Sequence, residues 1–152
     1  MKLHVKHLDG ARSLAALASH LEPKAVCWFD SGLERPGLGG QSVLCEVDQT
    51  VFSLGASCRH QDRVENIADR MRQAFSVGVP PRSALPSSSF TQELFMGGWV
   101  GYLAYEAQIA MDPAFPERNI DLPYPRAWFR RAHRGVTVSH RDDATLLWVW
   151  SD

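Results

Sequence analysis

Three glycines lie among bulky side chains in the segment "FMGGWVGYLAYE", which runs from Phe95 to Glu106. Their G-G-x-x-G spacing matches neither the G-x-G-x-x-G nor the G-x-x-x-x-G-K-[ST] pattern, so a nucleotide-binding loop is not predicted. A membrane-spanning helix is also disfavoured, because Glu106 would place a carboxylate in hydrocarbon. Paired glycines instead suit a site where a second backbone or a ligand approaches the chain closely.

Such a close approach predicts a junction between two elements. We expect Phe95 and Met96 to end a buried strand, and the chain then to pass through Gly97 and Gly98. A helix should follow, carrying Tyr102, Tyr105 and Glu106.

The composition is that of an ordinary globular chain. It has 152 residues, of which 45% are hydrophobic and 22% charged, with a formal net charge of -1. This length predicts one domain, and the near-zero charge gives no general attraction to nucleic acid or anionic lipid. The first residues lack the apolar core of a signal peptide, and Cys27, Cys45 and Cys58 show no C-x-x-C spacing. We therefore expect a cytoplasmic protein without a disulfide framework or a zinc site.

Hydrophobic periodicity predicts mainly strands that follow one another as hairpins. The predicted order β-α-β-β-β-α-loop-β-α-β-β indicates the α+β class, with mainly antiparallel, sandwich-like sheets and about three helices. A Pro- and Ser-rich stretch over residues 76–90 is expected to be a flexible connector within a single domain of residues 1–152. The predicted strands cover residues 3–8, 26–29, 43–47, 51–54, 95–96, 136–138 and 146–150. The predicted helices cover residues 14–21 and 62–75, and a third helix is predicted after Gly98. Turns are predicted at residues 48–49 and 141–143.

Histidines and arginines give weaker signals. His4 and His7 would point to opposite faces of a strand, and the other histidines are scattered, so no metal or catalytic set is predicted. The C-terminal hairpin interleaves arginines with aromatic residues, which could bind a single-stranded nucleic acid in a free-standing module. Nearby acidic residues balance the arginines, so a solvated strand face is the preferred interpretation. These arginines are Arg126, Arg130, Arg131, Arg134 and Arg141.

The segment "CWFDSG" closes the strand predicted at residues 26–29 with polar residues. Asp30 and Ser31 follow a run that should be buried, so they could line the mouth of a cavity that holds a small charged ligand. A turn closed by Gly32 explains the same residues. From this segment alone the turn is the preferred interpretation.

Together these segments resemble a known family. The glycine segment resembles F-x-G-G-x-x-G-Y-x-x-Y-[DE], a signature of component I of anthranilate synthase and of aminodeoxychorismate synthase. "AVCWFDSG" resembles the family's buried strand ending in serine, and "GGQSVLCEV" lies where the family has an R-Y-S-x-x-G-type segment. "NIDLPYPRAWF" and the hairpin after it keep the family's order, so the resemblance extends from about Ala25 to Trp150. The residues that match the glycine signature are Phe95, Gly97, Gly98, Gly101, Tyr102, Tyr105 and Glu106.

The resemblance covers only the N-terminal region of these enzymes. It implies that the catalytic chorismate-binding domain, with its Mg²⁺ carboxylates, is absent from these 152 residues, and that they contain no catalytic residue and no cofactor. The family's N-terminal region carries a tryptophan pocket. That pocket is a feedback site in anthranilate synthases and can hold a structural tryptophan in aminodeoxychorismate synthases.

Position by position, the serine of the family's L-L-E-S motif falls on Ser31, with Asp30 in place of Glu. The serine of R-Y-S falls on Ser42, while Gly40 and Gln41 replace the Arg and Tyr. The pocket has therefore lost a cation and an aromatic wall, which argues against tight tryptophan binding.

The expected function is that of the N-terminal domain of aminodeoxychorismate synthase component I, in p-aminobenzoate and folate biosynthesis. Its expected partners are its own chorismate-binding domain and a glutamine amidotransferase subunit, with L-tryptophan as a candidate ligand. The alternative within the family is the allosteric domain of anthranilate synthase, and "FDSG" favours the former. The candidate ligand-binding residues are Asp30, Ser31, Ser42, Gly97 and Gly98, and those facing the missing domain are Tyr102, Tyr105 and Glu106.

Overall fold

The computed structural model describes residues 1–21, 26–31, 34–35, 38–55, 64–76, 94–107, 114 and 123–151. Contacts divide the chain into two compact units. The first unit comprises Met1–Gln49, Pro80–Gly98 and Arg131–Asp152, and the second comprises Thr50–Val79 and Trp99–Arg130. Because each unit is built from separate stretches of chain, each depends on contacts between residues far apart in the sequence.

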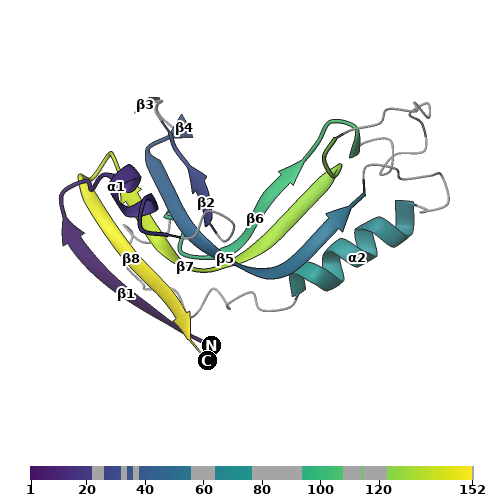
Figure 1. Cartoon of the computed structure of the whole chain (residues 1–152), viewed down its shortest axis with the longest axis horizontal. Coiled ribbons are helices and arrows are strands. Elements are labelled where there is room, and N and C mark those ends of the chain that lie inside the picture. Colours follow the sequence, from purple (N-terminus) through teal and green to yellow (C-terminus); the bar gives the residue numbers. More distant parts are fainter. Residues whose placement is uncertain are drawn as a thin grey trace. The chain divides into compact units, whose positions relative to one another are not determined.

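Strands predominate in the described residues (Figure 1). Six of them form one sheet in the order β1-β8-β7-β5-β2, in which β6 also pairs with β7, while β3 pairs with β4. The pairs β1–β8, β7–β8, β2–β5 and β3–β4 are antiparallel. The predicted α+β class with mostly antiparallel sheet is therefore confirmed. The elements are β1 (Lys2–Asp9), α1 (Leu14–Ala18), β2 (Val26–Phe29), β3 (Glu34–Arg35), β4 (Leu38–Gly39), β5 (Gln41–Leu54), α2 (Val64–Ser76), β6 (Gly98–Leu103), β7 (Ala127–Ser139) and β8 (Ala144–Ser151).

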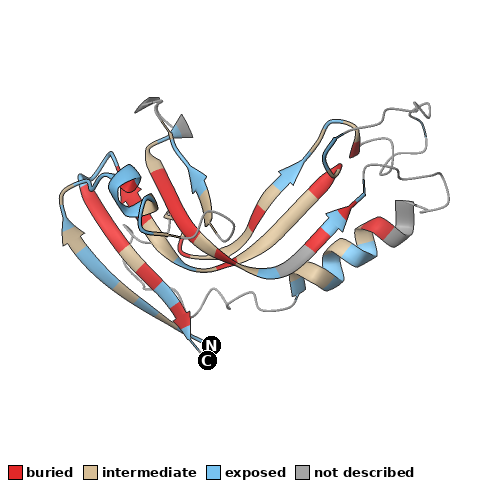
Figure 2. Cartoon of the chain, in the orientation of Figure 1, coloured by how far each residue is buried: buried red, intermediate tan, exposed pale blue. Residues whose placement is uncertain are grey.

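The core of the first unit lies between α1 and the sheet. Leu14 of α1 packs against Leu44 of β5 and Val138 of β7, and all three are buried. Figure 2 shows buried residues along β5, β7 and β8, whereas β1 at the sheet edge alternates between exposed and half-buried residues. The helix is short, and Ser13 at its N-cap position makes no side-chain capping bond. Burial of the leucine face therefore contributes more to holding α1 than local capping does.

In the second unit, α2 packs on one face of the sheet. Ile67 of α2 is buried against Phe52 and Leu54 of β5 and against Ala127 of β7. Phe75 of α2 meets the ring of Phe129 edge-on, with 5.1 Å between centroids. The apolar stripe at helical spacing thus confirms the predicted helix, although Asp62 and Arg63 lie outside the described residues.

The C-terminal hairpin agrees with its prediction. Residues 140–143 form the turn, and Ser139 pairs with Ala144 where the two strands meet. Strands β1 and β2 also match the strands predicted over residues 3–8 and 26–29. Of the predicted connector over residues 76–90, Ser76 is the last residue of α2 and the rest lies outside the described residues.

The turn predicted at Asp48-Gln49 is wrong, because β5 runs without interruption from Gln41 to Leu54. The carboxylate of Asp48 accepts a hydrogen bond from Arg131 Nε on β7, at 2.9 Å. A polar pair that looks like a turn in the sequence is therefore a strand position whose charge has a partner on the neighbouring strand.

The prediction for the glycine segment is also wrong in its elements. Phe95 and Met96 precede a strand rather than ending one, and Tyr102 lies within β6 rather than on a helix. Tyr105 and Glu106 lie in the turn that follows, where Ala107 N–H donates to the Ala104 carbonyl at 3.0 Å. The expected continuation through residues 108–113 lies outside the described residues.

The strand at residues 26–29 is not buried as predicted. β2 lies at the edge of the six-stranded sheet, and Trp28 and Phe29 are 47% and 45% exposed. The described strands form one six-stranded and one two-stranded sheet, and the described helices number two. No helix in the described part of the chain is long and apolar enough to cross a membrane.

Candidate functional site

Ser42 is the centre of a polar network at the start of β5. Its hydroxyl donates to Asp30 Oδ1 at 2.5 Å and accepts the backbone N–H of Ser31 at 3.2 Å. The Nε2 atom of His140 lies 2.7 Å from the same oxygen. Because the single hydroxyl proton is donated to Asp30, we assign the proton of this third bond to the imidazole.

The antiparallel register explains why these residues meet. Phe29 of β2 pairs with Val43 of β5, so the next residue along β2, Asp30, reaches the level of Ser42. On the other side of β5, His140 N–H donates to the Gly40 carbonyl at 2.9 Å and brings the imidazole to Ser42. The network therefore joins the ends of three strands, β2, β5 and β7.

The geometry of this network limits its chemistry. Ser42 is 2% exposed, and its hydroxyl uses its one donor and both acceptor positions. In a nucleophilic triad the imidazole lies between the acid and the hydroxyl, whereas here the hydroxyl lies between the other two groups. Ser42 is thus a structural cross-link, while the exposed Asp30 and His140 can meet a ligand.

The segment before β6 is fastened to the sheet by a second set of contacts. Gln41 Oε1 accepts the N–H of Phe95 at 3.0 Å, and Thr137 donates its hydroxyl to the Phe95 carbonyl. Trp150 Nε1 donates to the Met96 carbonyl at 2.6 Å. These bonds hold the predicted glycine pair directly above buried aromatic side chains.

Gly97 is required at its position by both space and backbone conformation. Its φ is +108°, and a Cβ built there would lie 2.5 Å from Trp150 Nε1. Gly98 has a φ of +125°, but a Cβ there would meet nothing within 4 Å. Gly101 belongs to a different contact, since a Cβ there would lie 1.9 Å from the Trp128 carbonyl oxygen. Close packing against neighbouring groups thus explains why glycine is found among bulky side chains at positions 97 and 101.

The structure brings some of the predicted ligand-binding residues together and separates others. Asp30, Ser31 and Ser42 share one network. Successive side chains of a strand point to opposite faces. Gln41, which holds the glycine segment, therefore lies on the opposite face of β5 from Ser42. Gly97 is therefore tied to the face opposite the Ser42 network.

The predicted interface residues lie in the second unit. Tyr102 is 39% exposed, donates its hydroxyl to the Pro125 carbonyl at 3.0 Å, and stacks on Trp128 with ring centroids 6.3 Å apart. Tyr105 is 80% exposed, and Glu106 is half-buried. The exposed rings of Tyr102 and Tyr124 meet edge-on. Tyr102, Tyr124 and Trp128 together form an aromatic surface in this unit.

The arginines of the hairpin are largely engaged within the protein. Arg131 pairs with Asp48, and Arg134 pairs with Glu46 through Nε at 2.8 Å. Arg126 is 4% exposed, and the guanidinium of Arg130 lies 5.1 Å from the ring centroid of Trp128. These contacts weaken the alternative in which the arginines bind nucleic acid.

Among the described residues, burial strongly affects the thiol of Cys45. Desolvation, with the neighbouring Cys27 thiol as a second cause, raises the pKa of Cys45 to about 12. Cys45 is fully buried and lies directly opposite Cys27 in the register of β2 and β5. Within the described residues, no group of three or more His, Cys, Asp or Glu side chains could hold a metal ion.

Two residues of the site were not predicted. His140 completes the Ser42 network, and Trp150 fixes the glycine segment. Each lies far along the sequence from its partner, so periodicity gives the face of its strand but not the strand beside it. Comparison with protein-family models gives no matching family, and comparison with curated proteins gives no match.

Proposed function

We propose that this chain is the N-terminal domain of component I of aminodeoxychorismate synthase. The observation that carries the proposal is the 3.2 Å hydrogen bond from Ser31 N–H to Ser42 Oγ. The family resemblance assigns these two serines to one pocket. They are eleven positions apart in the sequence, and antiparallel pairing of β2 with β5 brings them into contact.

In this proposal the domain acts as a scaffold with a small-ligand site beside Asp30. The Asp30 carboxylate complements an ammonium group, and Trp28 lies on the same face of the strand, two residues earlier. Trp28 is 47% exposed and offers a ring on which an indole can stack. An amino acid such as L-tryptophan carries both groups, whereas Gly97 and Gly98 would support this end of the sheet indirectly through Gln41.

The aromatic surface of the second unit supports the expected interface. Aromatic residues are enriched where proteins meet partners. Tyr102 belongs to this surface, and Tyr105, three residues later, is 80% exposed. We assign it, with Glu106, to the contact with a chorismate-binding domain that holds Mg²⁺ and works with a glutamine amidotransferase subunit. The sandwich-like arrangement, a third helix, a single domain and a cytoplasmic location stay predictions of the same proposal.

The complete protein that contains this chain provides the test of activity. With chorismate, Mg²⁺ and ammonia, we expect 4-amino-4-deoxychorismate as the product, detected by chromatography and mass spectrometry. Formation of anthranilate, which is fluorescent, would instead support the anthranilate synthase alternative. Absence of both products, from a protein that is folded by circular dichroism, would overturn the proposal.

Calorimetry with L-tryptophan tests the ligand site separately. We expect weak binding that decreases about tenfold in Asp30→Asn, because the ammonium then loses its charged partner in a partly exposed site. Micromolar binding that is lost in Ser31→Ala would favour the allosteric anthranilate synthase alternative. Equal binding by the wild type and by Asp30→Asn would remove Asp30 from the site.

A further inference from the structure

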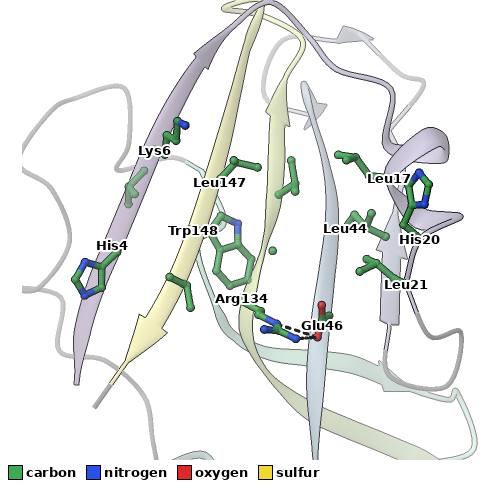
Figure 3. Close-up of a pocket in the computed structure, with 14 residues that line it drawn as sticks. His4, Lys6, Leu17, His20, Leu21, Leu44, Glu46, Arg134, Leu147 and Trp148 are labelled. Carbon is green, nitrogen blue, oxygen red and sulfur yellow. Dashed lines mark hydrogen bonds and ion pairs between the residues drawn. The ribbon is translucent and has the colours of Figure 1, made fainter.

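A groove separate from the Ser42 network lies on the sheet of the first unit (Figure 3). Its volume is about 470 Å³, which is within the range of small-molecule sites. In Figure 3, His4 and Lys6 of β1 lie on one side, and Leu17 of α1 and the following Leu21 lie on the other. Helix α1 covers part of this sheet face and leaves the strip beside β1 open.

The floor of the groove is aliphatic. Leu44, Val136, Leu147 and Val149 come from three neighbouring strands, and Leu17 and Leu21 continue the same apolar surface. Leu17 and Val149 are 37% and 38% exposed, so part of this surface is in contact with water. Trp148 also lines the groove, but its indole N–H is already donated to Thr137 at 3.0 Å. The side chains of the floor thus offer no polar partner to a ligand.

Charge is confined to the rim and is mainly positive. Glu46 is the one carboxylate among the lining residues, and the guanidinium of Arg134 pairs with it. Lys6, His4 and His20 supply the remaining charge or hydrogen-bond donors. An anionic head group therefore meets a complementary rim, on which Lys6 supplies an ammonium group.

These features select one class of ligand. A zwitterionic amino acid would bring an ammonium to a cationic rim, and an indole N–H would lose its water without a partner on the floor. A chain of methylene groups needs no partner, and each one buried contributes about 0.8 kcal/mol. We propose that the groove binds an unbranched aliphatic carboxylate of medium length, with its chain along Leu44 and Leu147 and its carboxylate at Lys6.

Calorimetry with octanoate and decanoate tests the apolar part. Two additional methylene groups should tighten binding roughly tenfold if they are buried on the floor. Val149→Asp should weaken decanoate binding more than about tenfold, because it places a carboxylate, with the same charge as the ligand's head group, beside the apolar alkyl chain. This position is exposed, and circular dichroism checks that the variant remains folded. The absence of saturable heat from decanoate up to about 1 mM would overturn the proposal.

Lys6→Gln tests the head group, with Lys2→Gln as its matched control. Both variants remove one positive charge from the same face of β1, but Lys2 does not line the groove. The two positions are about 13 Å apart along the strand, beyond the Debye length of about 8 Å at physiological salt. We expect Lys6→Gln to weaken decanoate binding up to about fivefold and Lys2→Gln to leave it unchanged. Equal effects of the two variants, or equal affinities for octanoate and decanoate, would show non-specific adsorption and refute the site.

Discussion

The two faces of the first-unit sheet are organised differently, and adjacent residues of β5 mark the change. On one face Val43, Cys45 and Val47 are buried, and the glycine segment is held there through Gln41. On the other face Ser42 joins a carboxylate to an imidazole. The first face depends on close packing and dryness. The second face packs against α1 through Leu44, and its end around Ser42, the polar face, depends on the pairing of polar groups.

This difference shows why a single motif could not define the whole site. The glycine pair and the two serines belong to one family resemblance, yet different interactions fix them on different faces of the same strand. The effect of a substitution on stability or reactivity should therefore depend on which face carries it. The dry face should be sensitive to volume and to charge, and the polar face to the loss of a hydrogen-bond partner.

Cys45 gives the largest expected effect, because it tests the dryness of its face. Burial raises the pKa of its thiol from 9.0 to about 12, so the folded protein keeps it protonated at pH 8. We expect iodoacetamide to label Cys45 about a thousandfold more slowly in the folded than in the urea-unfolded chain, since the thiolate is the nucleophile. Peptide mass spectrometry separates Cys45 from the half-buried Cys27.

The pH dependence of this labelling has a definite sign. A raised pKa means that the native rate keeps increasing about tenfold per pH unit between pH 9 and 11, as the thiolate fraction grows. The unfolded chain should level off above its ordinary value near 9. A native labelling rate that also levels off near pH 9 would show that water reaches Cys45 and that this face of the sheet is not dry.

Gly97→Ala tests the packing of the same face, with Gly98→Ala as its control. Both glycines have positive φ, so each substitution strains the backbone by about 1–3 kcal/mol. Only at Gly97 would the new methyl group clash with Trp150, which adds about 1–3 kcal/mol of overpacking. Urea titrations should therefore give the lower free energy of unfolding for Gly97→Ala. Equal losses would mean that Trp150 moves aside without cost.

The fold was predictable where the signal is local. Alternation of apolar and polar residues predicted β1 and the hairpin of β7 and β8, and an apolar stripe at helical spacing predicted α2, because burial on one face imposes each period. It failed at Asp48, where the partner that allows a charge within a strand is Arg131, 83 residues away. It failed again at Tyr102, because the strand β6 forms by pairing with β7, where Gly101 lies close against the backbone of Trp128.

The candidate site was predictable only in part, for a related reason. The resemblance linked Ser31 with Ser42, and the register of β2 and β5 supplies the physical contact. His140 was absent from the prediction because the pairing of β5 with β7 joins distant segments. The edge position of β2, which exposes Trp28, is likewise a property of the sheet order and cannot be read from four apolar residues.

Ser42→Ala gives a smaller effect than Gly97→Ala and tests the polar face. Removing a buried hydroxyl leaves Asp30, His140 and the Ser31 N–H without their shared partner, which should lower the free energy of unfolding by about 2 kcal/mol. Ser31→Ala is the matched control, because the bond to Ser42 uses its backbone N–H and survives the substitution. We expect a change below about 0.5 kcal/mol there.

Asp30→Asn separates charge from hydrogen bonding within the same network. The amide oxygen can still accept the Ser42 proton, so the loss should fall between those of the two serine variants. Urea unfolding at neutral pH measures all three. If Ser31→Ala destabilised the protein as much as Ser42→Ala, the Ser31 hydroxyl would be the stabilising group. The polar face would then be organised around the end of β2 rather than around β5.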